Sequence, residues 1–98
     1  MRATATIGAH HPALAGHFPG NPIVPGVVLL HRVCRAVVET HGRRIVAVPA
    51  ATFHARLQPA ETVDIVLDAP RGSRIAFRVF RGEELIASGT LAMAAPDE

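Results

Sequence analysis

The sequence predicts an α+β domain in which a curved antiparallel sheet of about five strands wraps one long central helix. Three observations lead to this class: one long helical pattern, apolar and polar residues that alternate on both sides of it, and tight turn signals between the later alternating runs. Because 98 residues provide one modest core and no linker divides the chain, residues 1–98 are expected to form a single domain.

The first elements are a short strand, a stiff loop and a helix. Alanine and isoleucine alternate with polar residues over residues 2–8, which predicts a strand. Residues 9–25 hold four of the eight prolines, and proline excludes regular helix there. Long loops of this kind in compact domains are often functional. Pro25 then suits a helix start, and Gly42 suits a helix end.

The helix between these two signals is expected to be covered on most sides. At helical spacing most of its circumference is apolar, and only a narrow stripe is polar. The apolar face contains Val27, Leu30, Val33, Cys34, Val37 and Val38. The polar stripe contains Arg32, Arg35 and Glu39, and His31 falls at the border between face and stripe.

The residues after the helix predict four antiparallel strands. Apolar residues dominate or alternate in four runs, which cover residues 44–57, 62–69, 74–80 and 84–93. Turn signals separate these runs at Pro59–Ala60, Arg71–Ser73 and Arg81–Gly82. Pro49 lacks a backbone N–H, so the first of these strands is expected at a sheet edge or with a bulge.

Composition excludes several classes of protein. Hydrophobic residues make up 49% and charged residues 18%, which excludes an intrinsically disordered chain. An aromatic share of 4% without Trp or Tyr argues against nucleic-acid binding by base stacking. No apolar run approaches the length of a membrane span, and the N-terminal MRATATIGAHH lacks a signal-peptide core, so a cytoplasmic protein is expected. The single Cys34 excludes an internal disulfide and a cysteine-based zinc site, and no metal is expected.

The most informative segment is Gly16–Leu30, which reads GHFPGNPIVPGVVLL. It resembles the hallmark of the bacterial 3-hydroxyacyl-ACP dehydratases of the FabA/FabZ type, in which G-H-F-P-G-x-P-x-x-P-G-V leads into the central helix of a hot-dog fold. Every fixed position of that run is present. Weaker resemblance continues over Phe53–Ile65, where Ala60 and Glu61 replace the usual Gly and Asp, and over Gly82–Met93. The chain is similar to a short form without the N-terminal extension, some members of which serve aryl-polyene or other specialised lipid pathways.

This resemblance implies dehydration of 3-hydroxyacyl-ACP thioesters to trans-2-enoyl-ACP in fatty-acid or related lipid or polyene biosynthesis. Such a reaction needs a base for the α-proton, an acid for the departing hydroxyl and a donor for the thioester carbonyl. The imidazole of His17 suits the base, because imidazole accepts a proton near neutral pH. The N–H of Gly26 lies at a helix N-terminus without an intrahelical partner, so it suits the carbonyl donor. The resemblance implies the same two assignments.

Position 31 departs from the family, which carries there an acidic residue that reaches into the site of the partner protomer. This chain has His31, whose imidazolium could protonate the leaving hydroxyl at the cost of a second near-cation close to His17. Alternatively, His31 is a residue at the border of the core, and the chain is a non-catalytic hot-dog subunit that pairs with an active paralogue. An acyl thioesterase is a weaker alternative, because it needs a carboxylate to activate water and the helix offers only Glu39.

The resemblance also implies an acyl tunnel between protomers, a basic rim and a dimer. Tunnel residues would be Phe18, Val27, Leu30 and Phe53. The rim candidates, chosen by helix stripe and neighbourhood, are Arg32, Arg35, Arg43, Arg44 and Arg56. All ten basic residues are arginines and the net charge is +2, so such a rim would attract an acidic acyl carrier protein. The substrate would arrive on phosphopantetheine without a further cofactor, at a homodimer, a higher multiple or a heterodimer with a paralogue.

Overall fold

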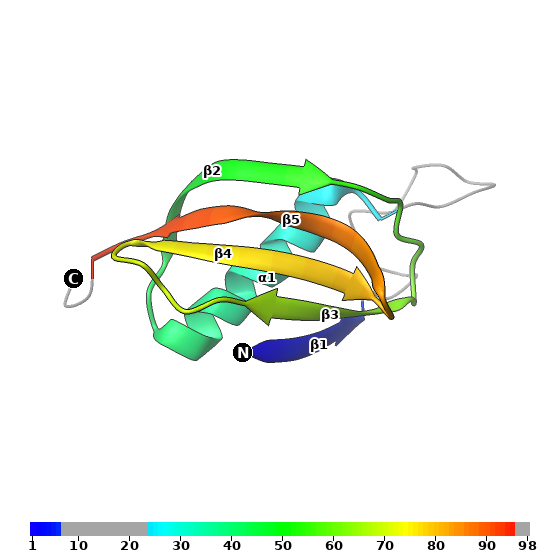
Figure 1. Ribbon diagram of the computed structural model, residues 1–98, viewed down its shortest axis with the longest axis horizontal. Coiled ribbons are helices and arrows are strands. Elements are labelled where there is room, and N and C mark those ends of the chain that lie inside the picture. Colours follow the sequence, from blue (N-terminus) through cyan, green and yellow to red (C-terminus); the bar gives the residue numbers. More distant parts are fainter. Residues whose placement is uncertain (7–23, 96–98) are drawn as a thin grey trace.

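The computed structural model describes residues 1–6 and 24–95. Its elements follow one another as β1 (Arg2–Thr6), α1 (Gly26–His41), β2 (Ile45–Phe53), β3 (Thr62–Leu67), β4 (Arg74–Arg81) and β5 (Glu84–Met93). The strands form one antiparallel sheet in the order β1-β3-β4-β5-β2, and α1 lies across one face of it (Figure 1). Within these ranges the predicted α+β class is confirmed. No helix in them is long and apolar enough to cross a membrane.

The core lies between α1 and the inner face of the sheet. Along β4, the side chains of Ile75, Phe77 and Val79 are buried, whereas those of Arg74 and Arg78 are exposed on the outer face. Other strands and α1 contribute the remaining large core residues, which include Val28, Leu29, Val33, Val37, Val63, Ile65, Leu67, Ile86, Leu91 and Met93. No polar or charged side chain is buried among the described residues, so this core depends on apolar packing.

Helix α1 begins and ends at the residues that the sequence predicts. Pro25 precedes its first residue and needs no N–H there. Gly42 adopts the left-handed conformation with φ of 66°, and its N–H donates to the carbonyl of Val38 at 2.8 Å. Glycine has no Cβ to oppose this conformation, so it ends the helix.

The face that α1 buries differs from the predicted one. The buried helix residues are Val28, Leu29, Val33, Ala36 and Val37. Val27 is 72% exposed and Val38 is 43% exposed, and Leu30 and Cys34 are only half-buried. The predicted phase was therefore wrong, because a helix that is apolar round most of its circumference gives periodicity little contrast. With 16 residues the helix is short, and within the described residues the sheet covers one side of it.

Strand β2 confirms both expectations that Pro49 raised. It lies at the edge of the sheet, bonded to β5 alone, and its register shifts between Ile45 and Ala47 and again between Ala47 and Ala50. Every residue of β2 after the half-buried Ile45 is exposed. The chain thus leaves a whole strand at one edge with little cover on either face.

The predicted turns are also present, and one of them holds an unusual residue. Ala60 has φ of 69° and is the one non-glycine residue with positive φ in the described part of the chain. Glycine adopts this conformation freely, whereas an L-residue with a Cβ is strained there.

We expect Ala60→Gly to raise the free energy of unfolding by about 0.5–1 kcal/mol, because glycine relieves the left-handed strain. Urea unfolding of both proteins measures the change. Ala69→Gly is the matched control: Ala69 has no positive φ, so glycine there adds unfolded-state entropy and should not stabilise. An equal effect of the two substitutions would contradict the strain at Ala60.

Candidate functional site

The start of α1, the end of β2 and the loop after β2 enclose a pocket of about 240 Å³. Its lining residues are Val24, Gly26, Leu29, Phe53, Ala55, Arg56 and Leu57. The N–H of Val24 donates to the carbonyl of Leu57 at 2.7 Å, which joins the segment before the helix to the loop after β2. Two segments far apart in the sequence therefore hold the pocket together.

In this pocket the ring of Phe53 packs directly against the backbone of Gly26. A Cβ placed on Gly26 would lie 2.8 Å from Cζ of the Phe53 ring, closer than carbon atoms pack. Phe53 is 46% exposed, so one side of the ring rests on the helix start and the other side is open. Glycine at position 26 thus has a packing role beside any role of its N–H.

The helix N-terminus at Gly26 provides an electropositive end to the pocket. The carbonyl of Pro25 accepts the N–H groups of Val28 at 3.0 Å and Leu29 at 3.3 Å. Among the described residues, no side chain caps this end and none accepts the N–H of Gly26. A carbonyl oxygen placed here would meet an N–H donor and the positive end of the helix dipole.

His31 lies elsewhere, on the exposed flank of α1. It lines a groove along the helix with Cys34, Arg35, Val38, Glu39 and Ile45. It does not line the pocket at Gly26, so one chain does not bring these two predicted site residues together. Burial raises the pKa of the Cys34 thiol, which keeps it protonated at neutral pH and makes it a packing residue of the groove.

The predicted tunnel residues are divided in the same way. Phe53 lines the pocket at Gly26, whereas Val27 and Leu30 do not. His17 and Phe18 lie outside the described residues. Within the described ranges, no group of three His, Cys, Asp or Glu residues is placed to hold a metal ion.

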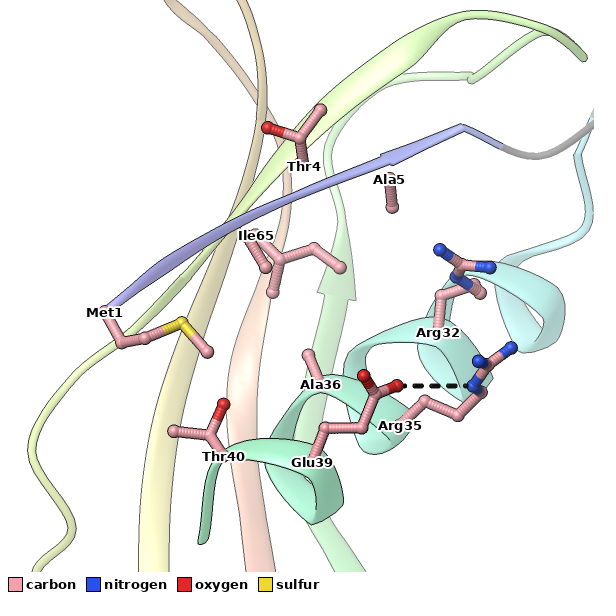
Figure 2. A pocket seen from close by; sticks show the side chains of 10 residues that line it. Met1, Thr4, Ala5, Arg32, Arg35, Ala36, Glu39, Thr40 and Ile65 are labelled. Atoms are coloured by element: carbon pink, nitrogen blue, oxygen red, sulfur yellow. Dashed lines mark ion pairs between the residues drawn. The ribbon is translucent and has the colours of Figure 1, made fainter.

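The five arginines predicted for carrier docking lie in three places. Arg56 borders the pocket at Gly26. Arg32 and Arg35 flank a second pocket between β1 and α1, where Arg35 Nε lies 3.6 Å from Glu39 Oε1 (Figure 2).

The other two arginines lie beyond the far end of the helix, roughly 24 Å from its start. Arg43 is held there by its Nε, which donates to the carbonyl of Ala94 at 2.8 Å, and by its Nη1, which donates to that of Gly72 at 3.3 Å. Arg44 is exposed beside it. Of the five, Arg56 alone borders the pocket at Gly26.

The structure adds residues that the sequence analysis did not select. Val24, Ala55 and Leu57 line the pocket, and only Val24 had a signal, since it lies inside the proline-rich motif. Arg81 and Glu61 join the loop after β2 to the β4–β5 hairpin at 2.8 Å. No local pattern predicts that pair, because its members are brought together only by the sheet.

Comparisons with known proteins identify the family and the fold of this chain. A family model described as ApeI-like, ApeI dehydratase, matches residues 1–90. The chain belongs to the ApeI-like dehydratase family. A 3-hydroxyacyl-[acyl-carrier-protein] dehydratase FabZ from Natranaerobius thermophilus is 28% identical over 106 residues, which covers 95% of this chain and 75% of that protein.

Solved structures show the fold of the family. A chain of the dehydratase heterocomplex ApeI:P from Xenorhabdus doucetiae has a TM-score of 0.82 at 19% identity, covering 95% of this chain and 85% of that chain. A structure of the fluoroacetyl-CoA-specific thioesterase FlK has a TM-score of 0.63 at 19% identity, covering 96% of this chain and 87% of that chain. At such identities these likenesses show the fold alone, and it is the hot-dog fold that the motif implied.

A double-mutant cycle tests the contact between Gly26 and Phe53. We expect Gly26→Ala to lower the free energy of unfolding by about 1 kcal/mol, because the new methyl group must displace the ring. In a Phe53→Ala background the same substitution should be neutral or stabilising, since alanine favours helix over glycine by up to about 1 kcal/mol. Urea unfolding of the four proteins gives the coupling, and additive effects would show that the ring does not rest on Gly26.

Proposed function

We propose that this protein dehydrates 3-hydroxyacyl thioesters carried by an acyl carrier protein. The observation that carries the proposal is the pocket at the start of α1. There the N–H of Gly26 has no acceptor among the described residues, and Gly26 belongs to the same motif as His17. Membership of the ApeI-like dehydratase family supports the same reaction.

In the proposed reaction the imidazole of His17 takes the proton from C2 of the substrate. The electron pair left on C2 spreads to the thioester oxygen, where the Gly26 N–H and the helix dipole stabilise the negative charge. That pair then forms the C2=C3 double bond as the hydroxyl leaves C3. A proton from the imidazolium of His31 on a second protomer converts the hydroxyl to water. His17 then releases its proton to solvent and His31 takes one up, so both side chains return to their starting states. No step requires a metal or an organic cofactor.

We expect His17→Ala to reduce turnover by about 10²–10⁴-fold, the usual worth of a general base. The proline-rich sequence around His17 predicts a loop, so we expect the melting temperature to change little. Product formation from a 3-hydroxyacyl-ACP, followed alongside thermal unfolding, measures both quantities. Near-normal turnover by a folded variant would remove His17 from the mechanism.

The proposed site needs a second chain, and the exposed surface of this one supports pairing. Val27 and Val38 on the flank of α1 and Val46, Val48 and Phe53 on β2 are large apolar side chains that are 41–72% exposed. Ile45 and Val38 line the same groove, so the helix flank continues into β2. We propose that a second hot-dog chain, either another copy or a paralogue, covers this surface. The heterocomplex of the Xenorhabdus dehydratase ApeI:P supports pairing of this kind.

Sedimentation at micromolar concentration tests the pairing. The purified chain alone should give a mass of about twice 10.4 kDa or a higher multiple, because exposed apolar area of this kind favours association. Val38→Glu on the exposed flank of α1 should shift the mass toward that of one chain. A stable 10.4 kDa species with a concentration-independent mass would rule out the homodimer.

A non-catalytic subunit remains the second candidate, because His31 stands where the family has an acid. The fold shared with the FlK thioesterase does not add a third, since that likeness shows the architecture alone and the helix carboxylate of Glu39 lies in an ion pair with Arg35. The two remaining candidates differ in what they require of position 31. One variant pair therefore separates them.

If His31 supplies the proton for the leaving hydroxyl, His31→Ala should lose activity. If the site lacks its acid, the wild type should be slow and His31→Glu should raise the rate. Turnover of the three proteins with the same 3-hydroxyacyl-ACP measures both outcomes. Equal rates for all three would remove His31 from the chemistry and favour the non-catalytic subunit.

A further inference from the structure

We propose that Arg81 is a positioning residue for the pocket at Gly26. It lies at the end of β4, outside the pocket lining, and acts through the backbone of the loop after β2. This inference rests on the proposed function in so far as it concerns turnover. Its structural part stands on contacts within the described chain.

The guanidinium of Arg81 joins two acidic side chains and one backbone carbonyl. Its Nη1 donates to the carbonyl of Arg56 at 3.1 Å and to Glu61 Oε1 at 2.8 Å. Its Nη2 donates to Glu84 Oε1 at 2.6 Å. The planar fork of arginine allows these contacts at once, and lysine has no equivalent geometry.

Glu61 extends the same connection along the loop. Its Oε1 also accepts the N–H of Gln58 at 2.8 Å. That backbone hydrogen bond, helped by the Arg81 charge, lowers the pKa of Glu61, so the carboxylate stays ionised at neutral pH. Arg81 therefore holds the loop at Arg56 directly and at Gln58 through Glu61.

The held loop is the wall of the pocket. Arg56 and Leu57 line it, and the carbonyl of Leu57 accepts the N–H of Val24 at 2.7 Å, two residues before Gly26. A short path thus runs from Arg81 through Arg56 and Leu57 to Val24 and the helix start. If the loop shifts, the wall shifts relative to the N–H of Gly26.

The value of these contacts lies in geometry more than in stability. The side chains of Arg81 and Glu61 are 30% and 31% exposed, and ion pairs at such positions usually stabilise a protein by about 0–1 kcal/mol. Misplacement of a reacting group by a fraction of an ångström, in contrast, can lower turnover by about 10-fold or more. Removal of Arg81 should therefore affect turnover more than folding.

Arg78→Gln is a matched control for Arg81→Gln. Arg78 lies on the same strand and pairs with Asp68 at 3.0 Å, with the two side chains about half exposed, but it makes no contact with the loop after β2. Both substitutions remove a β4 arginine from an ion pair. Only Arg81→Gln also removes the contacts that hold the loop after β2 at the pocket.

The first measurement is hydrogen exchange at the amide of Val24 in the full chain. We expect Arg81→Gln to speed this exchange by about 10-fold, with a change in melting temperature of only a few degrees, and Arg78→Gln to leave the exchange unchanged. Unchanged exchange in Arg81→Gln, or an equal increase in both variants, would overturn the proposal. This readout needs no activity.

The second measurement is turnover of a 3-hydroxyacyl-ACP. We expect Arg81→Gln to lower kcat by about 10-fold with KM changed by less than about 2-fold, and Arg78→Gln to retain both values. A wild type without dehydratase activity would contradict the proposed function. Hydrogen exchange at Val24 would then be the measurement that tests whether Arg81 holds the pocket wall in place. Faster exchange with unchanged kcat would overturn the role of Arg81 in the reaction.

Discussion

Helix α1 carries apolar side chains on two flanks, and the sheet of one chain covers only one of them. Val33 and Val37 lie against the strands, whereas Val27 and Val38 face outward. Burial of apolar area is the main favourable term in folding and association, so the uncovered flank favours association with a second chain. The exposed edge strand β2, the groove at His31 and the separation of His31 from Gly26 all follow from this division.

The site is divided in the same way as the apolar surface. The pocket at Gly26 holds a donor and an aromatic wall, and the groove at His31 holds a titratable side chain on the opposite flank. Among the described lining residues, the pocket has one ionisable side chain, Arg56, and the groove has His31, Cys34, Arg35 and Glu39. In the proposed mechanism the two halves come from different chains, so the concentration of chains would control the amount of complete site.

Local signals in the sequence predicted most of the fold. Pro25 and Gly42 place the ends of α1 because each has a backbone property that the helix interior cannot use. The buried face of α1 was not predictable in the same way, because valines at 27, 28, 33, 37 and 38 surround the axis and favour no single direction. Tertiary contacts alone decide which of them face the sheet.

The site was predictable where a motif lies next to a structural element. Gly26 follows from the helix start and lines the pocket there, while the role of its N–H stays a prediction. The link from Arg81 to Glu61 and Arg56 was not predictable, because these residues are 20 and 25 positions apart and meet only when β4 and the loop after β2 are in place. The scattering of the candidate arginines has the same cause, since helix stripe and neighbourhood say little about distance across a fold.

The bulge around Pro49 has a consequence for the chain before it meets a partner. An exposed edge strand offers free N–H and C=O groups to any other extended segment, and such edges promote uncontrolled aggregation. Proline removes one donor from β2, and the two register shifts interrupt the regular spacing that a foreign strand would need. The apolar side chains of β2 therefore stay available to a complementary partner chain. The irregular edge at the same time resists fibre growth by strand addition.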